Sequence, residues 1–117
     1  MSLRQERCQA CRAGAPQVTD EEIRQLKPQI PDWEIVEEDG VRKLRRTFRF
    51  PNFAQALEFT LRVGQMAEEQ DHHPSILTEW GRVTVTWWTH KIRGLHRNDF
   101  IAAAKCDELL AGTSSPT

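Results

Sequence analysis

The sequence predicts an α+β fold, in which a four-stranded antiparallel sheet carries three helices on one face. The first observation is the order of patterns along the chain, which alternates as helix, hairpin, helix, hairpin, helix. Hairpins separated by helices typically build one antiparallel sheet with its helices segregated to one side. The second observation is the length of 117 residues, which suits a single domain that buries its core without disulfides or a metal.

The first helix is expected to follow Thr19. Thr19 and Glu22 have the spacing of a capping box, in which each side chain binds the backbone N–H of the other residue. Pro28 should end the regular helix at or just before Lys27, because proline lacks an N–H and restricts the residue that precedes it.

Two hairpins account for the four strands. Asp39-Gly40 lies between two alternating runs, and Asp-Gly is a strong signal for a two-residue hairpin turn. The second hairpin joins residues 76–80 to residues 83–90, a run rich in β-branched and aromatic side chains. One of these strands is expected at a sheet edge, which could pair with a second copy of the chain.

The two remaining helices follow the hairpins. Residues 53–70 have the pattern of a long helix, and the last helix should begin near Asn98 or Asp99, which are both good N-caps. A glycine in the apolar stripe of the long helix would let that helix approach the sheet closely. The stripe consists of Phe53, Leu57, Leu61 and Gly64.

The chain divides into an N-terminal arm at residues 1–18, a domain at residues 19–111 and a polar tail at residues 112–117. The arm shows neither the period of a strand nor that of a helix, so we expect it to be loose. For the same reason we expect residues 1–16 to be dispensable for activity.

Composition excludes several classes of function. Sixteen Lys and Arg residues against 17 Asp and Glu give a net charge of -1, without the basic excess that a nucleic-acid footprint requires. No apolar run is long enough to span a membrane, and the first residues lack the apolar segment of a secretory signal. An odd number of cysteines, three, makes a disulfide framework unexpected and favours the cytoplasm.

A zinc site is the alternative that the cysteines raise. Cys8 and Cys11 have metal-ligand spacing, and His90 with His96 could form the second half of a site. The separation of Cys11 from His90 is far beyond the ~12–15 residues between the halves of a zinc finger, so we expect no metal site.

Histidines are the strongest candidates for chemistry. His72 and His73 follow the long helix, and His90 ends the aromatic strand. If the helix end and the strand end meet, three imidazoles converge, with Glu68 and Asp71 near enough to hold a ring nitrogen. The alternative is a solvated helix C-terminus, where the helix dipole favours histidine.

Three short motifs lie within residues 19–111. They are Glu68-x-x-Asp71-His72-His73-Pro74, Val83-x-Val85-x-Trp87-Trp88-Thr89-His90 and Gly94-Leu95-x-x-x-Asp99. Together they resemble the motifs of the pterin-4a-carbinolamine dehydratases, also called 4a-hydroxytetrahydrobiopterin dehydratases. That family has an α+β fold with four antiparallel strands and three helices, as the order of elements already indicates.

The resemblance implies loss of water from the 4a-carbinolamine of a tetrahydropterin, giving quinonoid dihydropterin in the recycling of tetrahydrobiopterin. It implies acid–base catalysis without a cofactor, because the pterin is itself the substrate. The implied catalytic residues are His72, His73 and His90, of which we favour His72 and His90 as the proton-transfer pair. The implied substrate-binding residues are Glu68, Asp71, Trp88, Thr89 and Lys91.

The resemblance also implies a homodimer or a dimer of dimers. Its main departure is His96, since the family usually has Thr or Ser at this position, where a hydroxyl would cap the last helix. The alternative function is a non-catalytic dimerisation or binding module that keeps the fold without the enzyme's role.

Overall fold

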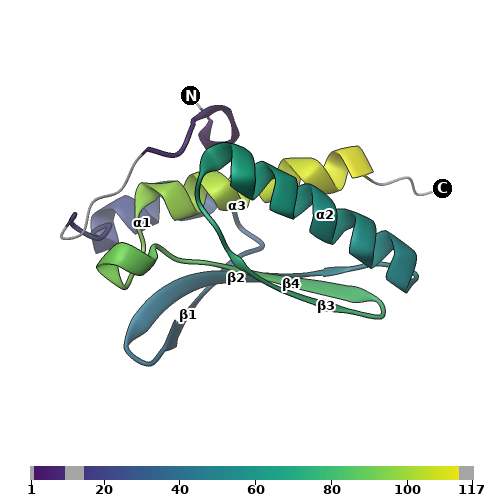
Figure 1. The fold of residues 1–117 in the computed structure, drawn as a ribbon. Coiled ribbons are helices and arrows are strands. Elements are labelled where there is room, and N and C mark those ends of the chain that lie inside the picture. The colour runs from purple at the N-terminus through teal and green to yellow at the C-terminus, as the bar shows by residue number, and fades with distance from the viewer. Residues whose placement is uncertain (1, 10–14, 114–117) are drawn as a thin grey trace.

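The structure, a computed structural model, describes residues 2–9 and 15–113. It contains a four-stranded antiparallel sheet with three helices lying on one side of it (Figure 1). The main elements follow one another in the order α-β-β-α-β-β-α. The expected fold class is therefore confirmed.

Helix α1 spans Asp20–Leu26 and begins with the expected capping box. The N–H of Glu22 donates to Thr19 Oγ1 over 3.1 Å, and the N–H of Thr19 donates to Glu22 Oε1 over 2.8 Å. A 3-10 turn follows at Lys27–Gln29, where Pro28 ends the regular helix.

The sheet has the strand order β1-β2-β4-β3, so β1 and β3 are its edges. Asp39 (φ 54°) and Gly40 (φ 76°) both adopt the left-handed backbone that a type I′ hairpin turn requires. The strands are β1 (Glu34–Glu38), β2 (Val41–Arg49), β3 (Ser75–Glu79) and β4 (Arg82–Trp87).

Helices α2 (Phe53–Gln70) and α3 (Arg97–Thr113) cover the sheet (Figure 1). Large aromatic side chains fill the space between these helices and the strands, and all of them are nearly inaccessible to solvent. They are Trp33, Phe48, Phe59, Trp87 and Phe100. The core lies on this face of the sheet, and among the described residues no helix or strand covers the other face (Figure 1).

The apolar stripe expected to bring α2 close to the sheet instead faces outward. Phe53, Leu57 and Leu61 are 44%, 51% and 62% exposed, and a Cβ added at Gly64 would meet no atom within 4 Å. The buried side of α2 is a different one, formed by Ala56, Phe59, Val63, Met66 and Ala67. The helix is apolar on two sides, and on the buried side the Phe59 ring contacts Phe48 and Phe50.

Residues 2–9 pack against the domain, which differs from the loose arm expected from the sequence. Leu3 lies in a short 3-10 helix beside α3 and is fully buried. A single buried leucine in a three-residue turn leaves no periodic pattern in the sequence, which is why this packing was not expected.

Candidate active site

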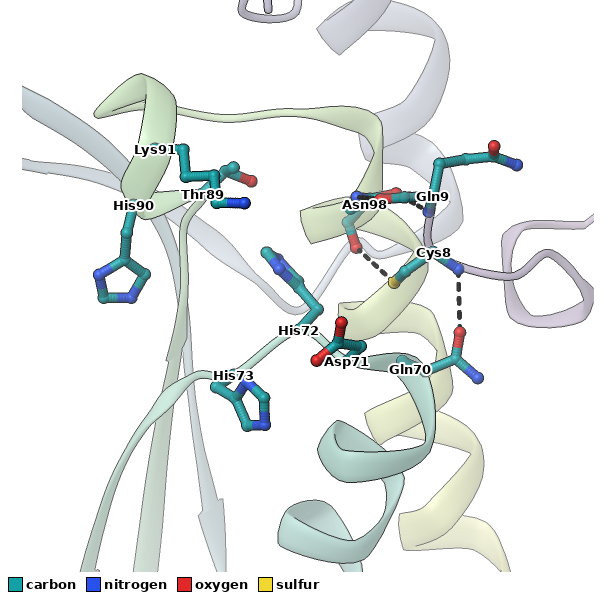
Figure 2. A pocket seen from close by; sticks show the side chains of 10 residues that line it. All are labelled: Cys8, Gln9, Gln70, Asp71, His72, His73, Thr89, His90, Lys91 and Asn98. Atoms are coloured by element: carbon teal, nitrogen blue, oxygen red, sulfur yellow. Dashed lines mark hydrogen bonds between the residues drawn. The ribbon is translucent and has the colours of Figure 1, made fainter. Parts of the chain in front are cut away.

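A pocket of about 290 Å³ opens at the end of the sheet where the termini of α2 and α3 meet (Figure 2). This volume is near the lower end of the range for small-molecule sites. Four segments line it: Cys8 and Gln9, then Gln70 to His73, then Thr89 to Lys91, and finally Asn98. The end of α2 and the end of the β4 strand therefore meet, as the convergence of three histidines requires.

The end of α2 sets the directions of His72 and His73. Asp71 adopts a left-handed conformation (φ 52°, ψ 42°) that terminates the helix. The two following side chains then diverge, because the His72 side chain is 11% exposed whereas the His73 side chain is 54% exposed.

His72 is bound to a buried carboxylate. Its Nε2 lies 2.6 Å from Asp99 Oδ1, and its ring stacks on Trp87 with centroids 5.4 Å apart. Asp99 is fully buried and accepts two further hydrogen bonds, from Thr89 Oγ1 over 2.8 Å and from the N–H of His96 over 2.9 Å. An ionised carboxylate only accepts hydrogen bonds, so toward such a partner Nε2 of His72 is the donor, and the lone pair of a neutral His72 ring is then on Nδ1.

His96 caps the last helix although it replaces the Thr or Ser that is usual in the family resembled. Nδ1 of His96 accepts the N–H of Asn98 over 3.0 Å, as a Thr or Ser hydroxyl would do at this position. Helix α3 therefore begins at Arg97, slightly earlier than the start near Asn98 or Asp99 expected from the sequence.

Asp99 is a site residue that the sequence analysis does not predict. The sequence indicates it only as a helix cap and as part of a motif. Its position three residues after the capping residue His96 is the acidic position of a capping box, which a search for such spacings could have found.

The other two histidines are more exposed to solvent than His72. His73 Nε2 lies 2.7 Å from Glu68 Oε2, so Glu68 contacts His73 rather than the pocket itself. His90 does not end the strand, in contrast to the expectation from the sequence: β4 ends at Trp87, and His90 begins a 3-10 turn. Its ring packs on Trp88, with centroids 4.4 Å apart. Trp88 likewise contacts a lining histidine, while Lys43 Nζ lies over its ring at 4.1 Å from the centroid.

The remaining expected site residues line the pocket. Asp71 lies at the end of α2, and Thr89 and Lys91 flank His90 (Figure 2). The hydroxyl of Thr89 is already donated to Asp99, so its observed role is to hold the carboxylate.

Cys8 and Gln9 are pocket residues that were not expected from the sequence. Burial raises the pKa of the Cys8 thiol to about 11, and the nearby Asp99 charge acts in the same direction. The thiol is therefore protonated near neutral pH and is a poor nucleophile. Cys11, the other half of the considered zinc motif, lies outside the described residues.

The described part of the chain shows neither a cluster of metal ligands nor a membrane-spanning helix. Within residues 2–9 and 15–113, no three or more His, Cys, Asp or Glu side chains are grouped so that they could hold a metal ion. Within the same ranges, no helix combines the length and apolar character needed to cross a membrane.

The arrangement suits proton transfer to and from a small flat molecule. Imidazoles exchange protons at physiological pH, and three of them line one pocket. The ring of His72 is additionally fixed in orientation by a buried carboxylate, as in sites where histidine acts as a base.

The chain is similar to proteins of a known family. The family model described as pterin 4 alpha carbinolamine dehydratase matches residues 16–109. A protein of Nitrosococcus oceani named "Putative pterin-4-alpha-carbinolamine dehydratase" is 66% identical over 103 residues, which cover 88% of this chain and 91% of that protein. A protein of Syntrophotalea carbinolica with the same name is 62% identical over 108 residues, or 92% of this chain and 96% of that one.

Solved structures show the same fold. A Brucella melitensis protein described as a transcriptional coactivator/pterin dehydratase superposes with a TM-score of 0.71 at 29% identity, over 80% of this chain and 98% of that one. A pterin dehydratase-like protein described as a RuBisCO assembly factor in the alpha-carboxysome superposes with a TM-score of 0.58 at 26% identity. That match covers 71% of this chain and 93% of the other.

Proposed function

Because this chain belongs to the pterin-4a-carbinolamine dehydratase family, we propose that it dehydrates a pterin-4a-carbinolamine to quinonoid dihydropterin by histidine acid–base catalysis. The observation that carries the proposal is a pocket lined by three histidines, His72, His73 and His90. The ring of His72 is held in place by the buried Asp99. The physiological setting would be the recycling of tetrahydrobiopterin.

The reaction needs one base and one acid. The base removes the proton from N5 of the pterin, and the N5 electron pair forms the N5=C4a double bond. The C4a–O bond breaks at the same time, and the departing hydroxyl takes a proton from the acid and leaves as water. An imidazole can perform either task near neutral pH.

We assign the base to His72. Its Nε2 donates to Asp99 over 2.6 Å, so the lone pair of Nδ1 can accept the N5 proton. The buried carboxylate then stabilises the imidazolium that forms, as it does in catalytic triads.

We assign the acid to His90, which lies across the pocket on the turn after β4 (Figure 2). Its ring packs on Trp88, which gives it a fixed position beside an aromatic surface. His73, held by Glu68, then binds or polarises the pterin. Asp71 and Lys91 supply polar groups at the pocket wall.

Loss of water neither oxidises nor reduces the pterin, so the proposed reaction needs no electron carrier. Because imidazoles act as the acid and the base, it needs no metal or nucleotide either. The proposal therefore includes no cofactor. Its prediction is that the purified protein keeps full turnover after treatment with a strong chelator.

We also propose that the chain forms a symmetric homodimer or a dimer of dimers. The supporting observations are the unpaired edge of β3 and the apolar side chains exposed on α2 beside it.

The direct test is turnover. The 4a-carbinolamine is generated in the cuvette by a tetrahydropterin-dependent hydroxylase, and quinonoid dihydropterin is followed by its absorbance with and without this protein. We expect acceleration over the spontaneous loss of water. Absence of acceleration from a folded protein would contradict the proposal.

Absence of turnover would favour a non-catalytic binding module. The observation behind this alternative is that one structural neighbour is described as an assembly factor and another as a coactivator. Binding of a stable pterin analogue separates the two functions, because a module that has lost the enzyme's role need not bind a pterin.

A further inference from the structure

Two consecutive residues of the N-terminal segment connect the ends of two helices. The N–H of Cys8 donates to Gln70 Oε1 over 2.9 Å, at the end of α2. The N–H of Gln9 donates to Asn98 Oδ1 over 2.8 Å, and Asn98 Nδ2 donates to the carbonyl of Gln9 over 2.7 Å, at the start of α3 (Figure 2). Segments far apart in the sequence are thereby joined at one edge of the pocket.

These two helix ends carry the two partners of the His72–Asp99 hydrogen bond. Gln70 lies two residues before His72, and Asn98 lies immediately before Asp99. Any separation of the end of α2 from the start of α3 would lengthen the 2.6 Å contact between His72 Nε2 and Asp99 Oδ1. The hydrogen bonds of Cys8 and Gln9 oppose that separation.

The N-terminal segment is itself firmly attached. Leu3 is fully buried against α3. Arg97 forms a bidentate pair with Glu6, with its Nε at 2.8 Å and its Nη2 at 2.6 Å from the two carboxylate oxygens. Lys105 Nζ donates to the carbonyl of Arg4 over 2.9 Å. The segment can therefore hold the two helix ends because it is anchored along α3.

We propose that residues 2–9 form a clamp that positions His72 on Asp99 and supplies one wall of the substrate pocket. This inference rests on the proposed function, because it assigns the clamp a part in proton transfer by His72. Gln70 and Asn98 act through His72 and Asp99 and are therefore positioning residues. Cys8 and Gln9 form the wall, so their loss should also weaken substrate binding.

Asn98→Ala is the sharpest variant, since it removes both hydrogen bonds to Gln9 and leaves a good helix former in α3. Misalignment of catalytic groups can lower the reaction rate by up to about 100-fold, so we expect kcat of Asn98→Ala to fall about tenfold or more. The matched control is Asn52→Ala, which removes a side-chain cap at the opposite end of α2. We expect that control to leave kcat and KM unchanged.

A second measurement does not depend on turnover. In protein labelled with ¹⁵N-histidine and free of substrate, the His72 Nε2–H bound to Asp99 should give a downfield, slowly exchanging NMR signal. We expect Asn98→Ala to abolish or broaden this signal and Asn52→Ala to preserve it. If the wild type fails to turn over the carbinolamine, the proposed function falls, while the NMR comparison still decides on the clamp.

Deletion of residues 1–9 completes the test. The sequence alone suggests that residues 1–16 are dispensable for activity, but the hydrogen bonds of Cys8 and Gln9 lead to the opposite expectation. If the shortened protein folds, we expect a raised KM, a lowered kcat and loss of the His72 signal. A folded deletion variant, or a folded Asn98→Ala variant, with wild-type kcat, KM and His72 signal would overturn the inference. If the deletion prevents folding, the Asn98→Ala result decides alone.

Discussion

Asp99 joins three parts of the site through one carboxylate. It holds the ring of His72, the hydroxyl of Thr89 and the N–H of His96 while it is completely buried. The charge lies in the first turn of α3, where the positive end of the helix dipole stabilises a carboxylate. A buried acid that satisfies three donors is expected to fix the tautomer of the histidine that it contacts.

Asp99→Asn should lower kcat by about 10²-fold or more, because His72, the proposed base, would lose the carboxylate that orients its ring. The amide NH₂ is a donor, but all three partners of Asp99 are donors as well. An NH₂ group facing His72 would need an acceptor at Nε2, which favours the tautomer with the proton on Nδ1. Steady-state kinetics measure the loss. Thr89→Val is the matched control, because it removes one donor to the same carboxylate and leaves the carboxylate itself in place. A larger loss of kcat in Thr89→Val than in Asp99→Asn would contradict this account.

Cys8 should be unreactive despite lining the pocket. Burial raises its pKa to about 11, so the thiol is protonated at neutral pH and becomes thiolate only as the pH approaches that value. In a Cys11→Ser background, alkylation of Cys8 by iodoacetamide at pH 8 should be about 10²-fold slower than in the urea-unfolded protein. Peptide mass spectrometry measures both rates, and equal rates would show that the thiol is not buried in solution.

At the scale of elements, local rules predicted the ends of helices and turns well. The capping box at Thr19, the stop at Pro28 and the Asp39-Gly40 turn all occur where the sequence indicates them. Each of these features depends on residues within a few positions of one another. Such features can be predicted because the physics that determines them is local.

The orientation of α2 could not be predicted in the same way. Its sequence has apolar side chains on two sides, and only contact with Phe48 and Phe50 shows why Phe59 is inside. Leu57 and Leu61 are as apolar as the buried residues, yet they lie outside. Which side is buried is a property of the whole core and not of the helix alone.

A polar cluster connects α3 to Trp33 and to β2. Asp107 Oδ1 accepts from Trp33 Nε1 over 2.8 Å and from Arg46 Nη1 over 2.6 Å. Asp107→Ala leaves both donors without this acceptor, which should lower the free energy of unfolding by about 1–3 kcal/mol. Urea denaturation measures the change.

The control for that variant uses the second carboxylate near Arg46. Asp32 Oδ2 lies 3.7 Å from Arg46 Nη2, and the Asp32 side chain is 69% exposed. Exposed pairs contribute little, so Asp32→Ala should change stability by less than about 1 kcal/mol. Equal losses of unfolding free energy in Asp107→Ala and Asp32→Ala would show that the burial of Asp107 does not determine how much it contributes to stability.

At the scale of the whole molecule, the apolar stripe of α2 lies beside the free edge of β3. Thr60 Oγ1 and Thr78 Oγ1 are 2.6 Å apart, so this side of α2 contacts β3. Leu57 is one helical turn from Thr60, and Trp80 in the following hairpin turn is 70% exposed. A symmetric partner that pairs β3 with its own β3 would cover this surface and extend the sheet.

Sedimentation equilibrium at micromolar protein should therefore give the mass of a dimer or of a dimer of dimers. Leu57→Glu should shift the protein toward the monomer, because it places a charge in the covered surface. Arg62→Glu, on another side of α2, should leave the mass unchanged. A monomeric wild type with full turnover would reject the assembly while leaving the enzymatic proposal intact.

The site itself was predictable only in part. The meeting of His72, His73 and His90 could be anticipated only on the condition that the helix end and the strand end meet, and the pocket shows that they do. The parts played by Asp99 and by residues 2–9 could not, since they depend on side-chain contacts between segments far apart in the sequence.

The measurement that tests the central claim most directly is the kcat of dehydration in single histidine variants. His72→Ala and His90→Ala should each lower kcat by about 10²-fold or more, because each removes a group that transfers a proton. His96→Thr is the control histidine variant, since a hydroxyl can replace the capping nitrogen and turnover should remain near that of the wild type. Wild-type turnover in both His72→Ala and His90→Ala would contradict histidine acid–base catalysis at this pocket.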